Sequence, residues 1–258
     1  MHWEPCIDVR AASTDTPSSE RFSHHGLHQV GSASESEPSE AGEFLLNATD
    51  SAVYLLRNRD NSPSLYCIDK DVECNFQPII IQLPVDGCSI TQLSCGKAHV
   101  VLLDSEGNVY SFGQGSRGEL GHGILDSESQ PKQLEAFECV KVKQICAGGW
   151  HTTAVTTDGD LYAWGWNESG QLGCSKDEIP TSTLPQPLEL GEDLNVVEAS
   201  CGSRHSLFLA DDGGVYGFGS NARHQLGPTV DGCCDRPTSI CNRAVALMAG
   251  GWSSVVKV

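Results

Sequence analysis

One motif occurs three times with the same internal spacing, and it constrains the fold more than any other feature of the chain. The copies are CGKAHVVLLDSEGNVYSFGQGSRGELG, AGGWHTTAVTTDGDLYAWGWNESGQLG and CGSRHSLFLADDGGVYGFGSNARHQLG, at residues 95–121, 147–173 and 201–227, and a fourth start occupies 249–258. Each full copy has an apolar β-rich run, a turn that contains glycine and a second β-rich run, which is typical of a β-hairpin. The starts lie 48 to 54 residues apart. This period predicts an array of similar units and not a fold built once.

The copies share their marker residues as well as their general pattern. Eight residues after the first histidine comes the glycine of the turn, fourteen after it comes a glycine preceded by an aromatic residue, and eight further comes a glycine preceded by leucine. We interpret these markers as residues that the repeat needs for its own structure. They are His99, His151 and His205, then Gly113, Gly165 and Gly219, then Gly121, Gly173 and Gly227.

Two further β-rich segments precede each hairpin, and the first of them begins with proline. The proline-led segments are expected at 78–83, 131–137, 187–190 and 237–241, and the second ones at 90–95, 140–146, 196–201 and 244–249. Proline suits an edge strand, because no ladder hydrogen bond is lost there. Two strands plus the hairpin make four, the content of a propeller blade. The prediction is an all-β propeller of four-stranded antiparallel blades over 78–258, in a ring that is incomplete or irregular.

The N-terminal part departs from the repeat. Residues 43–77 lack the marker residues and are expected to form a degenerate blade or an irregular lead-in. Residues 1–42 are rich in Ser, Glu and Pro, with the acidic run SASESEPSE at 32–40. Segments of this composition bury too little apolar surface to fold, so a disordered tail is expected.

The loops after the hairpins show a choice of residues that indicates backbone conformation. Gly115, Asn167 and Asn221 share one position, and glycine or asparagine at one position favours a left-handed backbone. Gly118 and Gly170 align with His224, where a positive φ is also expected. These loops are therefore shaped by the backbone and do not form a phosphate cradle.

Charge and composition exclude several classes of function. The net charge is −18, which opposes binding to nucleic acid and favours basic protein partners. Membrane spans and secretory signals need long apolar runs, and neither is present. The 12 cysteines include no C-x-x-C pair, and two of them replace alanine of the repeat, so free thiols are expected. No metal, cofactor or small-molecule substrate is predicted.

The motifs identify the chain as similar to the regulator of chromosome condensation repeat family. Its repeats carry G-x-x-H-[ST], then D-G-x-[LV]-[YF]-x-[FW]-G, then G-x-L-G, and residues 148–152, 158–165 and 170–173 match them in order. The resemblance covers about residues 78–258 and implies a propeller with blades of about 50 residues. The family's rings have seven blades, whereas from Phe44 this chain has room for about four, the last of which stops after its first strand pair.

The resemblance also suggests a function. AGGWH, WGWNESGQL and ASCGSRH resemble most a small nuclear member of the family, a partner of a JmjC-domain oxygenase that acts on chromatin. It implies a non-catalytic scaffold in histone methylation and chromosome segregation, located in the nucleus or, as a second location, the cytosol, with histones as further partners. The alternative is guanine-nucleotide exchange on a Ran-type GTPase. Family members that do this use one propeller face and an inserted β-wedge, and no such hairpin is found here.

The histidines do not indicate catalysis, because one recurs in each copy and Ser253 replaces it in the fourth. They are expected to pack blades and to hydrogen-bond the backbone. A binding surface is expected where large side chains stand at positions that the repeat does not fix, since Trp and Arg dominate interaction hot spots. The candidates are Lys97, Trp150, Trp166, Arg204 and Trp252.

Overall fold

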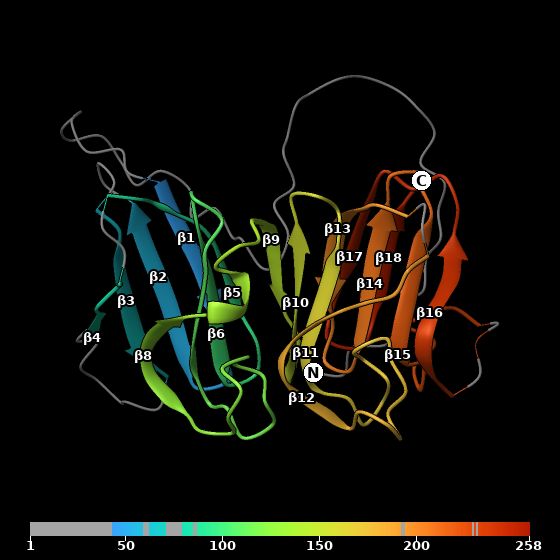
Figure 1. Ribbon diagram of the computed structural model, residues 1–258, viewed down its shortest axis with the longest axis horizontal. Helices are drawn as coiled ribbons and strands as arrows, with labels where there is room; N and C mark the ends of the chain where they lie inside the picture. Colours follow the sequence, from blue (N-terminus) through green and yellow to red (C-terminus); the bar gives the residue numbers. More distant parts are fainter. Residues whose placement is uncertain are drawn as a thin grey trace.

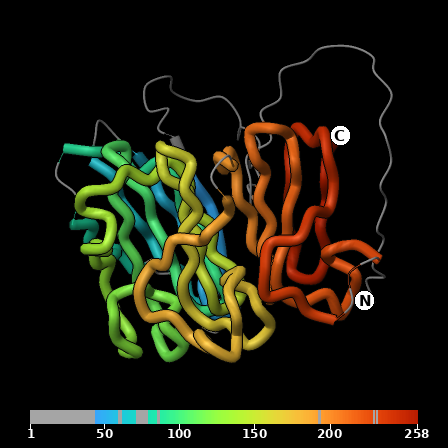
Figure 2. The backbone as a smooth tube through the Cα atoms, turned by 45° about the vertical axis from the view of Figure 1, so that its right-hand side comes forward, coloured from blue at the N-terminus to red at the C-terminus, as the bar shows by residue number. Residues whose placement is uncertain are grey.

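The computed structural model describes residues 43–58, 62–70, 79–84, 87–191, 194–228, 230 and 232–258. The expected disordered tail, residues 1–42, lies outside them. The described strands form four antiparallel sheets of four strands and one sheet of two strands. The sheets follow one another in sequence order, from blue to red in Figures 1 and 2. The predicted all-β propeller architecture is confirmed.

Blades 1 to 5 are named in chain order. Blade 1 holds β1 (Glu43–Ala48), β2 (Ala52–Asn58), β3 (Ser64–Asp69) and β4 (Ile79–Ile81); blade 2 holds β5 (Ile90–Cys95), β6 (His99–Asp104), β7 (Val109–Gly113) and β8 (Glu128–Gln133); blade 3 holds β9 (Val142–Ala147), β10 (His151–Thr156), β11 (Leu161–Trp166) and β12 (Thr181–Pro187); blade 4 holds β13 (Val196–Cys201), β14 (His205–Ala210), β15 (Val215–Ser220) and β16 (Cys233–Cys241); blade 5 holds β17 (Ala246–Ala249) and β18 (Ser254–Lys257). A short 3-10 helix, η1 (Glu135–Phe137), follows β8. None of the helices in the described part of the chain has the length and apolar content needed to span a membrane.

The register of the central hairpin explains the spacing of the markers. His151 lies directly opposite Gly165 in the β10–β11 pair, and His99 opposite Gly113 and His205 opposite Gly219 repeat this arrangement. Asp158 and Gly159 form the turn, with the Gly159 N–H donating to the Thr156 carbonyl. A fixed separation of fourteen residues is therefore the separation of two residues that face each other across a hairpin.

The proline-led strands belong to a different blade from the one expected. β8 pairs with β7 and β12 pairs with β11, so each closes the outer edge of the blade before it. They also begin earlier than predicted, at Glu128 and Thr181, and proline lies inside them. The reason is the path of the chain: the loop that follows each hairpin leads to a strand that pairs with the second strand of the same hairpin, and the next blade begins only after this strand.

Blade 1 extends beyond the limit expected at residue 77. β4 follows that limit and pairs with β3, through Leu65 opposite Ile81. We therefore propose that the first blade ends after Ile81. Among the described residues, no strand of blade 1 pairs with β17 or β18, and the five sheets form an array that strand pairing does not close.

The hydrophobic core is divided among the interfaces between blades. One cluster joins each neighbouring pair, as where Val101 and Phe137 of blade 2 meet Val142 and Trp164 of blade 3. All six residues of β6, β10 and β14 are buried, because a neighbouring blade covers each face of these strands. Such nearest-neighbour packing is characteristic of repeat architectures.

The loop after the hairpin confirms one backbone expectation and corrects another. His224 has a φ of 60°, as expected for the residue that replaces Gly118 and Gly170. The expected left-handed backbone at Gly115, Asn167 and Asn221 is wrong, since these residues are not among those with positive φ. A Cβ on Gly115 would lie 2.1 Å from the Asp126 carbonyl oxygen, which requires glycine on steric grounds.

Asparagine takes the same position in blades 3 and 4 because its side chain holds the loop together. The Asn167 amide nitrogen donates to the carbonyls of Cys174 and Ile179, and its oxygen accepts the Leu172 N–H at 2.9 Å. Asn221 repeats the last contact with Leu226 at 2.7 Å. Hydrogen bonding, and not φ, therefore selects asparagine here.

Candidate protein-interaction face

The loops between the first and second strands of the blades meet around the propeller axis. Their backbones are hydrogen-bonded from blade to blade, with Asp50 N–H donating to Lys97 O, Lys97 N–H to Gly149 O, and Ser203 N–H to Gly251 O, at 2.9–3.1 Å. Residues from all five blades line a cavity of about 400 Å³ at this end. Lys97, Trp150 and Trp252 are among them. We call this end the loop face.

The three repeat histidines link blades 2, 3 and 4 each to the following blade. Nε2 of His99 lies 3.0 Å from Thr152 Oγ1, Nε2 of His151 lies 2.9 Å from Ser206 Oγ, and Nε2 of His205 lies 3.1 Å from Ser254 Oγ. These partners are hydroxyl groups on the following blade, whereas backbone partners were expected. The sequence signal that could have revealed them is the Ser or Thr directly after the repeat position in the next copy.

The hydroxyl groups determine which imidazole nitrogen carries the proton. Thr152 donates to the Glu119 carbonyl at 3.0 Å, and Ser206 donates to the Gln171 carbonyl at 2.9 Å. Nε2–H of the preceding histidine must therefore donate to the hydroxyl oxygen. Burial lowers the pKa of His99 to about 3 and that of His205 to about 4, and the electrostatic effect of His151 is the second cause. Both rings are neutral near pH 7 and join blades.

Three of the marker glycines, Gly113, Gly165 and Gly219, lie where a Cβ would meet backbone atoms at 2.5–2.6 Å. Gly165, which faces His151, has a φ of 101°, and Gly113 and Gly219 have 108° and 103°. Gly121, Gly173 and Gly227 end the loops and also have positive φ. The pairing inside each hairpin and the positive φ values account for glycine at these positions without a ligand.

Five side chains of three blades form a group of cations packed on indoles, which we call the cation–π row: Lys97, Trp150, Arg117, Trp166 and Arg204. Lys97 Nζ lies 4.5 Å from the Trp150 ring centroid, and Arg204 Cζ lies 4.9 Å from the Trp166 ring centroid. Between them, Arg117 Cζ lies 4.6 Å from Trp150 and 4.1 Å from Trp166. The two indoles meet edge to face at 5.5 Å. Contacts of this length are attractive.

The row unites four of the five residues selected from the sequence. Trp252 is not part of it: it lines the cavity on blade 5 and is 51% exposed. Arg117 is a member of the row that was not predicted from the sequence. The available signal was its loop position, which holds Ser169 in blade 3 and Arg223 in blade 4 and is therefore not fixed by the repeat.

Arg117 is anchored through its backbone, and its guanidinium makes no hydrogen bond or ion pair with the residues that the structure describes, although its charge acts on the nearby Glu119 carboxyl. The Arg117 N–H donates to Glu119 Oε2 at 2.7 Å, as the Arg223 N–H does to Gln225 Oε1. Nη1 is enclosed and has no hydrogen-bond partner among the described residues. Within the same residues, no carboxylate lies at ion-pair distance from Arg117 or Arg204, and Lys97 pairs with Asp50 at 3.6 Å.

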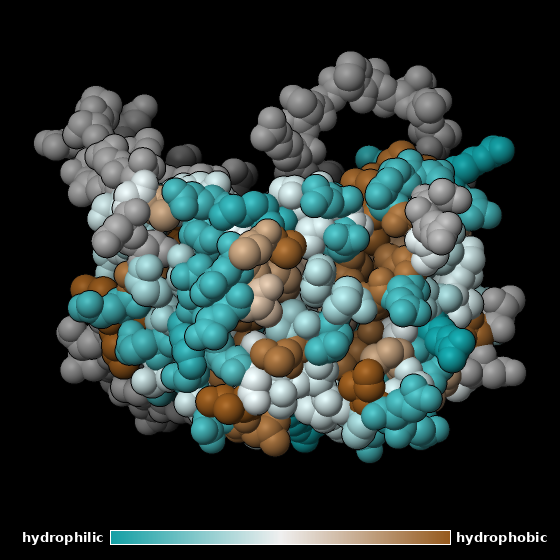
Figure 3. All heavy atoms as spheres, viewed as in Figure 1, coloured by the Kyte–Doolittle hydropathy of each residue, from teal (hydrophilic) through white to brown (hydrophobic). Residues whose placement is uncertain are grey.

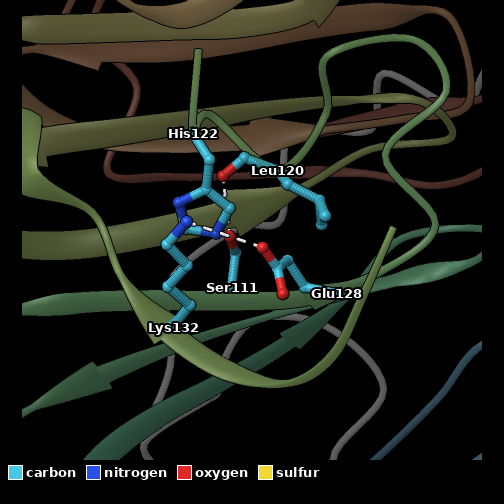
Figure 4. Close-up of polar contacts among 5 residues, drawn as sticks. All are labelled: Ser111, Leu120, His122, Glu128 and Lys132. Carbon is cyan, nitrogen blue, oxygen red and sulfur yellow. Dashed lines mark hydrogen bonds and ion pairs between the residues drawn. The ribbon is translucent and has the colours of Figure 1, made fainter. Parts of the chain in front are cut away.

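A serine and a histidine also meet away from the loop face, and their geometry differs from that of an activated nucleophile. Figure 4 shows Ser111 between Leu120 and His122. The buried Ser111 hydroxyl donates to the Leu120 carbonyl at 2.6 Å, so the contact with His122 Nε2 at 3.0 Å takes no proton from it. Glu128 is paired with Lys132 at 3.5 Å. The contact holds the loop of blade 2.

The described residues contain no group of three or more side chains that could hold a metal ion. All ten cysteines among the described residues are free thiols. Two of them, Cys146 and Cys201, are buried at the interface of blades 3 and 4, where the Cys201 N–H donates to Cys146 Sγ at 2.9 Å. Burial raises the pKa of Cys146, which suits a packing role.

The blades, the blade-linking histidines and the loop face together define a β-propeller of the protein-binding class. Two family models described as Regulator of chromosome condensation (RCC1) repeat match the chain, one at residues 106–155 and 158–209 and the other at 90–119, 142–171 and 196–225. The chain belongs to the regulator of chromosome condensation repeat family.

Curated relatives and solved structures agree with this assignment. The chain is 35% identical to the human RCC1 domain-containing protein 1, over 64% of this chain and 55% of the relative, and 33% identical to the ultraviolet-B receptor UVR8 of Arabidopsis thaliana, over 69% and 40%. It is similar to Prp20p of Saccharomyces cerevisiae, with a TM-score of 0.65 and 27% identity over 82% of this chain and 55% of that chain. That structure is described together with the binding of Prp20p to Gsp1p and histones. The chain spans about half the length of these proteins, and less of UVR8.

Proposed function

We propose that the chain is a non-catalytic scaffold that binds a chromatin-modifying JmjC-type oxygenase through the loop face. In this role it regulates histone methylation and chromosome segregation in the nucleus. The resemblance of its loop motifs to a small nuclear family member supports the choice of partner, and the cation–π row supports the choice of surface. The row is the observation that carries the proposal.

The row has the properties of an interaction hot spot. Tryptophan and arginine contribute most to binding energy when they cluster, and here four of the five side chains are of these types. Each stacked cation is held in place before a partner arrives, which reduces the conformational entropy lost on binding. The repeat does not require these two indoles, since another copy holds Ala98 and Gln114 at the Trp150 and Trp166 positions.

A first prediction follows for the surface. Trp150→Ala and Arg204→Ala are each expected to weaken binding of the oxygenase by about 1–3 kcal/mol while the melting temperature stays close to wild type. The measurement is affinity purification from nuclear extract with quantitative mass spectrometry, followed by titration of the purified pair. Arg223→Ala is the control, because Arg223 is exposed and contacts no indole. Recovery of the oxygenase at wild-type levels by both variants would place its binding surface elsewhere.

Guanine-nucleotide exchange on a Ran-type GTPase is the alternative, supported by the similarity to Prp20p and its binding to Gsp1p. The described strands all belong to the five sheets, so none of them forms an additional hairpin that could serve as a wedge. A nucleotide-release assay with purified small GTPases separates the two functions. The scaffold proposal expects release at the spontaneous rate, and accelerated release would replace it.

A further inference from the structure

We infer that the element that binds the cation–π row is an acidic peptide segment of the partner protein, with neighbouring carboxylates that pair with Lys97, Arg117 and Arg204. This inference rests on the proposed function of the loop face and specifies the chemistry of its partner. It begins from a mismatch of charge. The chain has a net charge of −18, yet the row gathers three cations.

The described residues supply few direct partners for these cations, apart from the electrostatic interaction of Arg117 with Glu119. Of the three cations in the row, Lys97 alone has an ion pair with a described residue, Asp50 at 3.6 Å, and both of these side chains are exposed. Exposed pairs of this kind contribute little energy, so an incoming carboxylate displaces Asp50 at low cost. Arg117 and Arg204 have neither an ion pair nor a side-chain hydrogen bond within the described part of the chain.

The stacking of Arg117 determines which ligand suits it. The two indoles form a corner around the guanidinium, since their ring centroids lie 4.6 and 4.1 Å from Cζ and only 5.5 Å from each other. Nη1 is enclosed, so the ligand is expected at the remaining N–H groups, on the side away from this corner. A carboxylate binds the edge of a guanidinium through two parallel hydrogen bonds. Arg117 therefore forms the centre of the site, with Lys97 and Arg204 on its two sides.

The same charges argue for a peptide and against nucleic acid. A duplex presents many phosphates along its length, and binding it requires an extended basic surface. Three cations on a strongly acidic protein neutralise a short acidic segment, whereas the rest of the chain repels a long polyanion. The expected ligand has several Asp or Glu residues within a few positions of one another.

The experiment uses the full chain and a fluorescein-labelled hexaglutamate peptide at low ionic strength, followed by anisotropy. Wild type is expected to bind the peptide, with weaker binding as salt is added. Arg117→Gln is expected to weaken binding about tenfold, and Arg223→Gln by less than twofold. The two arginines occupy the same loop position and make the same backbone contact, so the pair isolates the effect of the row. Melting temperatures show that both variants are folded.

Equal weakening by the two variants would assign the binding to net charge and overturn the inference, as would preference for a DNA duplex of equal charge. Absence of hexaglutamate binding by wild type would also overturn it. The scaffold proposal would survive these results, because it is tested by recovery of the oxygenase. Conversely, peptide binding that depends on Arg117, with no oxygenase recovered, would support the acidic-segment site and reject the oxygenase as partner. The chain's own acidic run at 32–40 is present in every variant and cancels in the comparison.

Discussion

Gly165→Val is expected to lower the free energy of unfolding by about 3–5 kcal/mol, enough to unfold a marginally stable domain. A Cβ at this position would lie 2.6 Å from the Trp150 carbonyl oxygen and 2.8 Å from the His151 Cα. A third contact, 3.2 Å from the Glu119 Cα, belongs to the neighbouring blade. All three neighbours are backbone atoms, so no side chain can rotate away. The φ of 101° adds strain for a β-branched residue.

Gly191→Val separates the two causes of this loss. Gly191 has almost the same φ, 98°, but nothing lies within 4 Å of a Cβ placed there. Backbone strain alone is expected to cost about 1–3 kcal/mol in this control. Chemical denaturation of the three proteins measures the difference. If Gly165→Val loses no more stability than Gly191→Val, the crowding between blades is not what selects glycine at this marker.

Acidification from pH 7 to pH 5 is expected to destabilise the fold by about 4 kcal/mol, about 2 kcal/mol from each of His99 and His205. Their pKa values fall from 6.5 in the unfolded chain to about 3 and about 4 in the folded protein, chiefly because the rings are buried. Below pH 6.5 the unfolded state takes up protons that the folded state does not, so folding loses stability. The loss continues until pH approaches the folded values.

His99→Gln tests the origin of this acid sensitivity. A glutamine amide can donate to the Thr152 hydroxyl in place of Nε2–H but does not titrate. The variant is expected to be less stable than wild type at pH 7 and to lose about 2 kcal/mol less between pH 7 and pH 5. Urea denaturation at several pH values gives both quantities. Parallel stability curves for the two proteins would show that groups other than His99 cause the loss.

The architecture could be predicted because the two strands of a hairpin belong to one continuous segment, so their pairing fixes the spacing of residues in the sequence. His151 and Gly165 are fourteen residues apart in sequence and opposite each other in the sheet, so spacing alone reveals the contact. The edge strands were assigned to the wrong blade because strand pairing beyond the hairpin depends on the path of the loop. β8 and β12 follow loops whose course the residue pattern did not specify.

The site was predicted in part for a related reason. Trp150 and Arg204 stood out because a repeat position that holds Ala, Trp and Arg is not fixed by packing. Arg117 lies in the loop of blade 2, and its importance comes from two indoles of blade 3. Contacts of this kind depend on how closely neighbouring blades approach. Because the sequence is similar in every repeat, it does not reveal which side chains of neighbouring blades come into contact.

The histidine links also limit the order in which repeats can be shuffled. Ala52 begins β2 where His99 begins β6, and blade 2 correspondingly has the apolar Val100 where blades 3 and 4 have Thr152 and Ser206. Blade 2 thus fits only behind a neighbour without an imidazole. Duplicated behind blade 4, it would set Val100 against His205 and leave a buried ring nitrogen without its acceptor, at a cost of about 1–3 kcal/mol. Recombination among these repeats must therefore exchange the histidine of one copy together with the hydroxyl of the next.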